Sequence, residues 1–146
     1  MNRYHIIATV HLCVIRDKKI LLSKRKNTGY RDNQYSLIGG HLETDETIIN
    51  GVIREVFEEI GVKLDIQKTQ LVHVMHRRKE HSLDEDRIEF YFTSDFNLSE
   101  IINKEYNKCD SLLWADIFNL PDNTVPYIKH FIQEYHKQKN YSEFGW

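Results

Sequence analysis

Three glutamates in one short segment have the clearest chemical potential in this chain. If the segment is helical, Glu55, Glu58 and Glu59 lie within an arc of roughly 100°, because each helical residue advances by about 100°. Glu55 and Glu59 repel at this spacing and cost an isolated helix about 0.2 to 0.5 kcal/mol. A divalent cation such as Mg²⁺, which prefers oxygen ligands, would offset that repulsion. The alternative is a solvated glutamate-rich face, the commoner explanation for an isolated triplet.

Two neighbours of the glutamates suit a metal site. Arg54 is four residues before Glu58, so it can orient that carboxylate from one side. Gly51 lies one turn before Glu55 and is expected to leave room above the carboxylates for a ligand. On these spacings alone, both the metal site and the solvated face stay open.

The glutamates need a helix, and residues 44–60 predict one. Apolar residues recur there every three or four positions, the period of an amphipathic helix. Thr44 or Asp45 is expected to cap its start, and Gly61 is expected to end it in a left-handed conformation.

Strand-like runs surround this helix. They lie at residues 6–15, 20–22, 35–38, 71–75, 88–93 and 112–115, and a second helix is expected after Thr124 and Pro126. We expect the Gly39-Gly40 pair to stop the strand before it, residues 77–79 to form a solvated hairpin tip, and the aromatic tail 141–146 to dock on the body. This order of elements predicts an α/β fold with a mixed sheet covered by helices.

Composition limits the class of protein. The 146 residues are 40% hydrophobic with a net charge of −2, which predicts one ordinary domain and argues against a nucleic-acid coat protein. Cys13 and Cys109 lack any metal or redox spacing and are expected to be buried free thiols. The first 17 residues have neither a signal-peptide core nor a membrane span, so we expect a cytoplasmic protein.

A longer pattern contains the three glutamates. Gly40 is followed by five residues and Glu46, then by seven residues and the run Arg54-Glu55-Val56-Phe57-Glu58-Glu59-Ile60-Gly61-Val62. Residues 40–62 thus resemble the Nudix box of the Nudix hydrolases at every fixed position. The resemblance implies a single Nudix domain over residues 1–146, an α/β/α sandwich with a mixed β-sheet, and Mg²⁺-dependent cleavage, with Mn²⁺ as an alternative metal, of a nucleoside diphosphate linked to another group.

The resemblance also implies roles for individual residues. Glu55, Glu58 and Glu59 would be the metal ligands, joined by a backbone carbonyl near Gly40. Either Glu58 or Glu59 would serve as general base, while Arg54 and Glu46 would brace the helix. Asp45 stands where many relatives carry Gly. Glu105 lies in a segment that resembles a loop of MutT-like triphosphatases with a further glutamate at the metals, although a solvated loop acid explains it equally well.

Substrate-binding candidates lie outside the box. By the same resemblance, Arg25 would contact phosphate, a role that its five donors suit. Tyr30 and Tyr35 could stack on a base, although Tyr35 is equally a core candidate. His5 and His11 have strand spacing and would share one face, either lining a base pocket or serving as structural histidines.

The expected substrate is a nucleoside triphosphate, cleaved to monophosphate and pyrophosphate by a MutT-like enzyme. The proline that ADP-ribose hydrolases of the family tend to carry after the box is absent near Arg77. A hydrolase of nucleotide sugars, dinucleotides or another diphosphate metabolite stays open, as does a Nudix-fold binding module that has lost catalysis. Intact glutamates disfavour the binding module. The expected partner is a small nucleotide and not a membrane, and both monomer and homodimer stay open.

Overall fold

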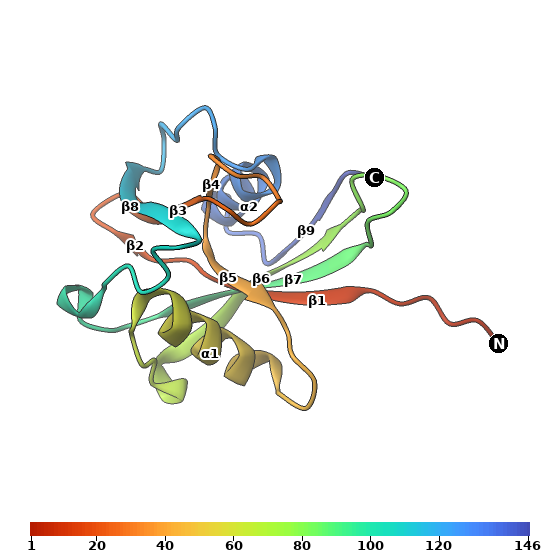
Figure 1. Cartoon of the computed structure of the whole chain (residues 1–146), viewed down its shortest axis with the longest axis horizontal. Helices are drawn as coiled ribbons and strands as arrows, with labels where there is room; N and C mark the ends of the chain where they lie inside the picture. The colour runs from red at the N-terminus through yellow and green to blue at the C-terminus, as the bar shows by residue number, and fades with distance from the viewer.

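The computed structural model describes residues 1–146 and contains two β-sheets and two α-helices (Figure 1). The five-stranded sheet has the order β5 (Ile38–His41), β1 (Ile7–Leu12), β7 (Arg87–Ser94), β6 (Thr69–Arg77) and β9 (Tyr141–Phe144). The second sheet joins β2 (Ile15–Arg16), β3 (Lys19–Arg25), β4 (Tyr35–Ser36) and β8 (Cys109–Asp116). The helices are α1 (Ile48–Ile60) and α2 (Pro126–His136), with short 3₁₀ turns at Ile66–Lys68 and Leu98–Glu100.

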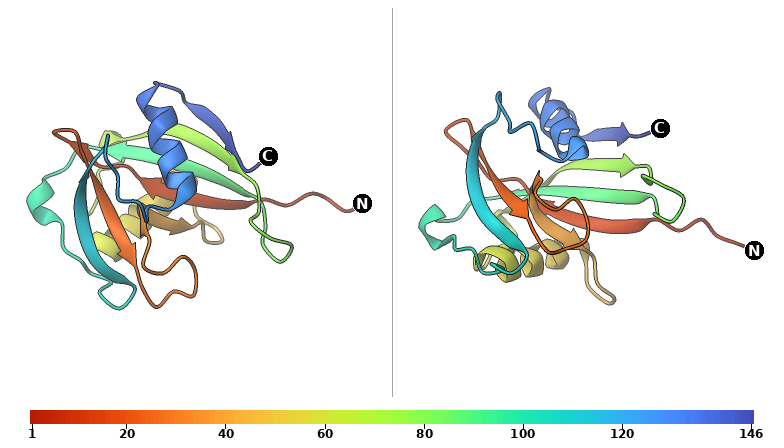
Figure 2. Two further views of the ribbon diagram at one scale, coloured as in Figure 1. Left: turned by 90° about the horizontal axis from the view of Figure 1, so that it is seen from above. Right: turned by 45° about the horizontal axis from the view of Figure 1, so that its top comes forward.

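The five-stranded sheet is mixed. β1 runs parallel to β7 and β6 runs parallel to β9, whereas the β1–β5 and β6–β7 pairs are antiparallel. Helix α1 covers one face of this sheet and α2 the other (Figure 2). The expected α/β architecture with a mixed sheet and a helix on each side is therefore confirmed. Neither helix is long and apolar enough to cross a bilayer.

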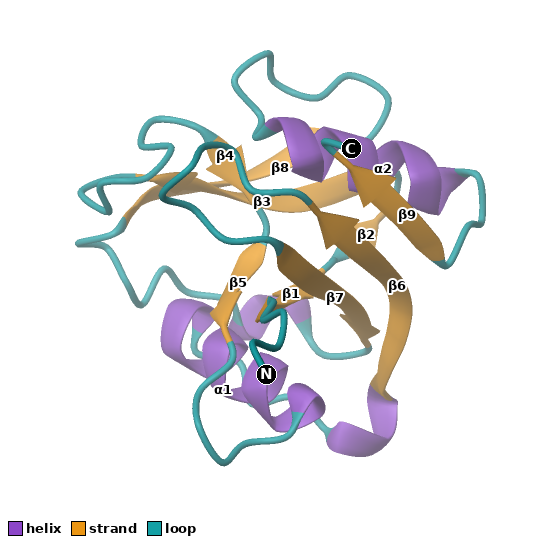
Figure 3. Ribbon diagram, turned by 90° about the vertical axis from the view of Figure 1, so that its right-hand side faces the viewer, coloured by secondary structure: helices purple, strands orange, loops and turns teal.

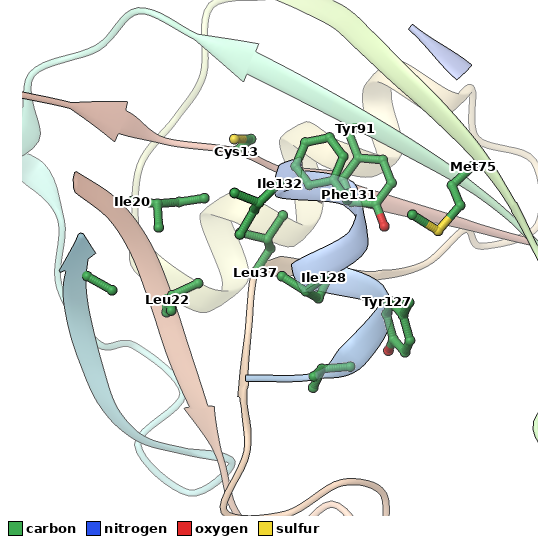
Figure 4. Close-up of a cluster of buried hydrophobic side chains, with 12 residues drawn as sticks. Cys13, Ile20, Leu22, Leu37, Met75, Tyr91, Tyr127, Ile128, Phe131 and Ile132 are labelled. Atoms are coloured by element: carbon green, nitrogen blue, oxygen red, sulfur yellow. The ribbon is translucent and has the colours of Figure 1, made fainter. Parts of the chain in front are cut away.

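Two apolar clusters hold the layers together. On the α2 side, Phe131 lies against Tyr91 of β7 with ring centroids 3.8 Å apart (Figure 4). The second sheet stands beside α2 (Figure 3) and contributes to both clusters, because alternate residues of a strand point to opposite faces. Ile20 and Leu22 pack in the α2 cluster, and Leu21 packs in the α1 cluster.

Helix α1 begins later than expected. Thr47, rather than Thr44 or Asp45, is its N-cap, and the Thr47 hydroxyl accepts a hydrogen bond from the backbone N–H of Asn50. Asp45 has a φ of 64°, a left-handed conformation that Asp tolerates better than most residues, so a helix cannot start there. The expected end is confirmed, because Gly61 has a φ of 72°.

The Gly39-Gly40 pair does not stop a strand, so that expectation was wrong. Strand β5 runs through both glycines, which pair with His11 and Val10 of β1. A Cβ atom on Gly39 would lie 2.1 Å from the carbonyl oxygen of Val10. The absence of a side chain therefore allows the close backbone approach on which this pairing depends.

The tail is docked, as expected. Strand β9 pairs with β6, and the Trp146 indole N–H donates to the His76 carbonyl oxygen over 3.1 Å. The Ser142 hydroxyl lies 2.7 Å from Nε2 of buried His73. The tail thus supplies the partner of His73 Nε2, while Nδ1 of the same ring bonds to the Lys139 carbonyl oxygen over 2.8 Å.

Candidate metal and diphosphate site

Arg54 organises the carboxylates of α1 and the loop before it. Its Nε and Nη2 atoms donate to the two carboxylate oxygens of Glu46 over 3.0 and 2.8 Å, a bidentate pair. Its Nη1 atom donates to Glu55 over 2.9 Å and to Glu58 over 3.2 Å. The arginine thereby fixes the loop against the helix and holds two of the candidate ligands. The hydrogen bonds to Arg54 lower the pKa of Glu46.

Glu55 and Glu59 face the edge strand β5. The backbone N–H of Gly39 donates to Oε2 of Glu59 over 2.7 Å. Gly40 is so close to the other carboxylate that a Cβ there would lie 2.6 Å from Oε1 of Glu55. The helix and the glycine strand therefore meet at their carboxylates, while Glu58 is nearer to solvent, with a side chain 46% exposed.

The environment of these carboxylates opposes their negative charge. Burial raises the pKa of Glu59 well above its usual range, and the charges of Glu55 and Glu105 raise it further. Burial also raises the pKa of Glu55, with smaller contributions from Glu58 and Glu105 against the opposing effect of Arg54. The site thus concentrates acidic oxygens where anions are unfavourable, a condition that a bound cation would relieve.

Glu105 lies near this site because the loop that carries it bonds to the C-terminal end of α1. The backbone N–H groups of Ile102 and Lys104 donate to the carbonyl oxygens of Ile60 and Glu59 over 3.1 and 3.0 Å. Carbonyls in the last turn of a helix lack partners within the helix, so this loop satisfies them. It also brings the Glu105 carboxylate close enough to raise the pKa of both Glu55 and Glu59.

The donor set fits a hard divalent cation. Carboxylate oxygens of Glu55, Glu58 and Glu59 would hold it, and Mg²⁺ favours such oxygen ligands. Their side chains do not enclose an ion in this conformation, since Arg54 bridges Glu55 and Glu58 instead. The fit rests on the crowding of acidic oxygens and the raised pKa values of Glu55 and Glu59.

Gly51 does not leave room for a ligand, contrary to expectation. A Cβ atom there would lie 2.7 Å from Cδ1 of Leu42 and 3.1 Å from Oε1 of Glu46. The loop before the helix fills the space, so this glycine serves packing.

The candidate substrate residues lie in different settings. Arg25 ends β3, and its Nε and Nη2 atoms donate to the Tyr30 carbonyl oxygen and the Thr28 hydroxyl over 2.8 and 3.1 Å. Arg25 pairs with Cys109 of β8, whose backbone N–H donates to the Glu105 carbonyl oxygen over 2.8 Å, so β3 ends beside the loop that carries Glu105. The Tyr30 hydroxyl donates to Glu80 over 2.8 Å. Tyr35 packs against the α2 cluster, which favours its core alternative.

His5 and His11 do not share a strand face, because β1 begins at Ile7 and His5 lies exposed before it. His11 is buried, its ring stacks on Tyr91 at 4.9 Å, and its Nδ1 atom has no hydrogen-bond partner. It pairs with Gly39 across the strands, so it lies directly beneath the glycine that binds Glu59.

Arg77 is not at a solvated hairpin tip, because β6 extends to include it. It is 2% exposed and donates from Nε to Glu89 over 3.0 Å, and its guanidinium lies 4.0 Å from the Tyr127 ring centroid. Glu89 also accepts from the Tyr91 hydroxyl over 2.8 Å. The sequence does hint at this buried pair, because Glu89 is the only charged residue among the apolar residues 88–92. Its partner Arg77 lies on another strand, so the pairing itself could not be read from the sequence.

Comparison with known proteins decides the family. A model of the NUDIX domain matches residues 5–135. The chain belongs to the Nudix family. It is therefore a pyrophosphohydrolase by family, as expected from the box.

Individual relatives carry different names. An ADP-ribose pyrophosphatase from Methanocaldococcus jannaschii is 29% identical over 140 residues, covering 93% of this chain and 76% of the relative. A MutT-like protein from Streptomyces ambofaciens is 34% identical over 64 residues, covering 44% of this chain and 39% of the relative.

Solved Nudix structures share the fold. A MutT Nudix hydrolase from Burkholderia pseudomallei superposes with a TM-score of 0.77 at 22% identity, covering 88% of this chain and 97% of that one. A MutT protein from Methanosarcina mazei gives a TM-score of 0.78 at 18% identity, with coverages of 94% and 98%.

Proposed function

We propose that this Nudix enzyme uses Mg²⁺ to hydrolyse a nucleoside triphosphate to a nucleoside monophosphate and pyrophosphate. One observation carries the proposal: Glu55 and Glu59 meet the Gly39-Gly40 edge, Arg54 holds Glu58 next to Glu55, and β3 ends with Arg25 beside the loop that carries Glu105. Acidic oxygens next to a cationic side chain suit a metal-bound polyphosphate. Mn²⁺ is the alternative metal, since it also prefers oxygen ligands.

The chemistry divides between the metal and the chain. Bound Mg²⁺ supplies charge neutralisation of the diphosphate and lowers the pKa of a coordinated water. Water oxygen forms a bond to phosphorus while the bridging P–O bond breaks, and pyrophosphate leaves. Glu58 or Glu59 accepts the proton of the attacking water. Arg25, whose Nη1 atom makes no hydrogen bond within the protein, donates to a phosphate oxygen.

ADP-ribose is a second candidate substrate. The relative named ADP-ribose pyrophosphatase aligns over 93% of this chain, which supports a sugar-linked diphosphate in the same site. The cleaved bond is again a phosphoric anhydride, and the products would be AMP and ribose 5-phosphate. The proposed metal site serves both substrates, so the distinction rests on product analysis.

The test is a hydrolysis assay with Mg²⁺ or Mn²⁺ on a panel of canonical and oxidised nucleoside triphosphates, ADP-ribose, other nucleotide sugars and dinucleotides. Monophosphate plus pyrophosphate from a triphosphate would support the first candidate, and turnover of ADP-ribose alone would replace it with the second. Glu58→Gln is expected to lose nearly all turnover with an unchanged unfolding temperature. Glu100→Gln, an exposed matched control on the 3₁₀ turn, should retain full turnover. Undiminished activity in Glu58→Gln would refute the assigned site.

A further inference from the structure

The loop over residues 26–34 sets the position of Arg25. The Asp32 carboxylate accepts hydrogen bonds from the backbone N–H groups of Thr28 and Gly29 over 3.1 and 3.0 Å, which closes the loop on itself. Arg25 is attached to the same loop, because its Nε atom donates to the Tyr30 carbonyl oxygen over 2.8 Å. Arg25 also pairs with Cys109 of β8, next to the loop that carries Glu105, so any displacement of the loop over residues 26–34 moves a guanidinium at the edge of the carboxylate site.

Glu80 ties this loop to the β6–β7 hairpin. Its Oε1 atom accepts from the Tyr30 hydroxyl over 2.8 Å and from Nη2 and Nε of Arg31 over 2.9 and 3.2 Å. Its own backbone N–H donates to the Asp84 carboxylate over 3.0 Å, which fixes Glu80 within the hairpin. Although partial burial opposes ionisation, the bonds from Tyr30 and Arg31 lower the pKa of Glu80, so it is charged at neutral pH.

The loop and the hairpin meet in a row of alternating cationic and aromatic side chains. Arg25 and Arg31 lie 5.4 and 5.8 Å from the Tyr30 ring centroid. Arg31 also lies 6.0 Å from the Tyr127 ring, and buried Arg77 lies 4.0 Å from the same ring. Cations over aromatic faces attract, but three neighbouring guanidinium groups repel one another.

Glu80 is the carboxylate that contacts two of these three cations. Besides Arg31, it lies 3.5 Å from Nη1 of Arg77. Glu89 also pairs with Arg77, but it lies on the sheet and touches neither arginine of the loop. Removal of the Glu80 charge would therefore take away the counter-ion that Arg31 and Arg77 share and weaken the attachment of the loop to the hairpin.

We infer that Glu80 is a positioning residue for catalysis: it holds the loop over residues 26–34 so that Arg25 is aimed at the substrate diphosphate. The inference rests on the proposed function, in which Arg25 contacts phosphate. It predicts that a residue with no contact to the Nudix carboxylates contributes to turnover. Misplacement of a phosphate-binding group by about 1 Å can cost up to a hundredfold in rate.

The test is a double-mutant cycle on kcat/KM, measured with the substrate that the hydrolysis panel identifies. Glu80→Gln is expected to lower kcat/KM about tenfold, Arg25→Ala to lower it at least as much, and the double variant to match Arg25→Ala alone. Glu85→Gln is the matched control, because it makes the same charge change at an exposed position of the same hairpin. Independent, multiplicative losses in the double variant would overturn the inference, as would wild-type activity in Glu80→Gln.

Hydrogen exchange provides a readout that does not require activity. Peptides covering residues 25–34 are expected to exchange about tenfold faster in Glu80→Gln than in wild type or Glu85→Gln, while peptides of α1 stay unchanged. Unchanged exchange in residues 25–34 would overturn the loop attachment even if no substrate were found. Fast exchange together with an inactive wild-type enzyme would instead retain the attachment and refute the proposed function.

Discussion

Two adjacent glycines are expected to give opposite results when changed to alanine. A Cβ on Gly39 would lie 2.1 Å from the Val10 carbonyl oxygen and 2.8 Å from Cα of His11, both backbone atoms of the neighbouring strand. Gly39 also has a φ of 156°. A Cβ on Gly40 would meet only the end of the Glu55 side chain, at 2.6 Å from Oε1. Gly39→Ala should therefore lower the stability of the fold, whereas Gly40→Ala should displace the carboxylate of a candidate metal ligand.

The magnitudes follow from what must move. Gly39→Ala requires β5 to shift away from β1, so we expect a loss of about 3 kcal/mol, at the upper end of the cost of overpacking. For a domain of this size that lowers the unfolding temperature by roughly 6 to 12 °C. Gly40→Ala requires only a new rotamer of Glu55, so we expect a stability loss below about 1 kcal/mol. The displaced carboxylate should cost about tenfold or more in Mg²⁺-dependent turnover.

Calorimetry and a Mg²⁺ titration of hydrolysis test both glycines together. The expected pattern is an unstable Gly39→Ala and a stable Gly40→Ala whose half-saturating Mg²⁺ concentration has increased. Glu100→Gln serves as control in both assays, because Glu100 is exposed on the 3₁₀ turn Leu98–Glu100. Wild-type Mg²⁺ dependence in Gly40→Ala would refute the placement of Glu55 at the metal, and wild-type stability in Gly39→Ala would refute the close strand approach.

Three further predictions concern stability. Burial alone would raise the pKa of Asp84, but hydrogen bonds from the backbone and from its arginine partner lower it to about 2. A carboxyl whose pKa is lower in the folded state stabilises the protein at pH values above its unfolded-state pKa, and the stabilisation is lost as the pH falls toward 2. Asp84→Asn should therefore cost about 1 kcal/mol near pH 7 and nothing near pH 2, as measured by urea unfolding. Arg77→Met leaves Glu89 in the core without its arginine partner and should cost about 3 to 5 kcal/mol, with recovery on adding Glu89→Gln; full stability of the single variant would contradict the buried pair. Ser142→Ala removes the partner of His73 Nε2 and should cost about 1 to 2 kcal/mol in thermal unfolding, whereas no change would mean that the tail bond contributes nothing.

The helices and most strands could be predicted from the sequence because their signals are local. The apolar period of α1 and the glycine at its end need no information beyond a few turns of chain, and both are confirmed. Helix α1 begins at Ile48, four residues later than expected, because Asp45 has a left-handed φ and Glu46 binds Arg54 across eight positions. A capping residue chosen from local preference cannot reveal that competing bond.

The remainder of the site depends on contacts between distant segments. The run of glutamates placed three carboxylates together correctly, but the burial of Glu59 depends on strand β5 and on the loop of Glu105. Arg77 begins a charged run that is typical of a turn, yet it is buried in the core, where it pairs with Glu89 of the next strand. Glu80 and Tyr30 are separated by 50 positions, and no periodicity links them.

Arg54 has two effects on the candidate metal site that oppose each other. Its bonds to Glu55 and Glu58 offset the like-charge repulsion on the helix, so the fold tolerates the cluster before a cation binds. The same bonds engage oxygens that would bind the cation in the proposed site. Nε and Nη2 of Arg54 are held by Glu46, so the arginine would keep its place if Nη1 released Glu55 and Glu58. In the proposed site, the bidentate Glu46 pair would thus allow one residue to stabilise the carboxylates without metal and to release them to a metal.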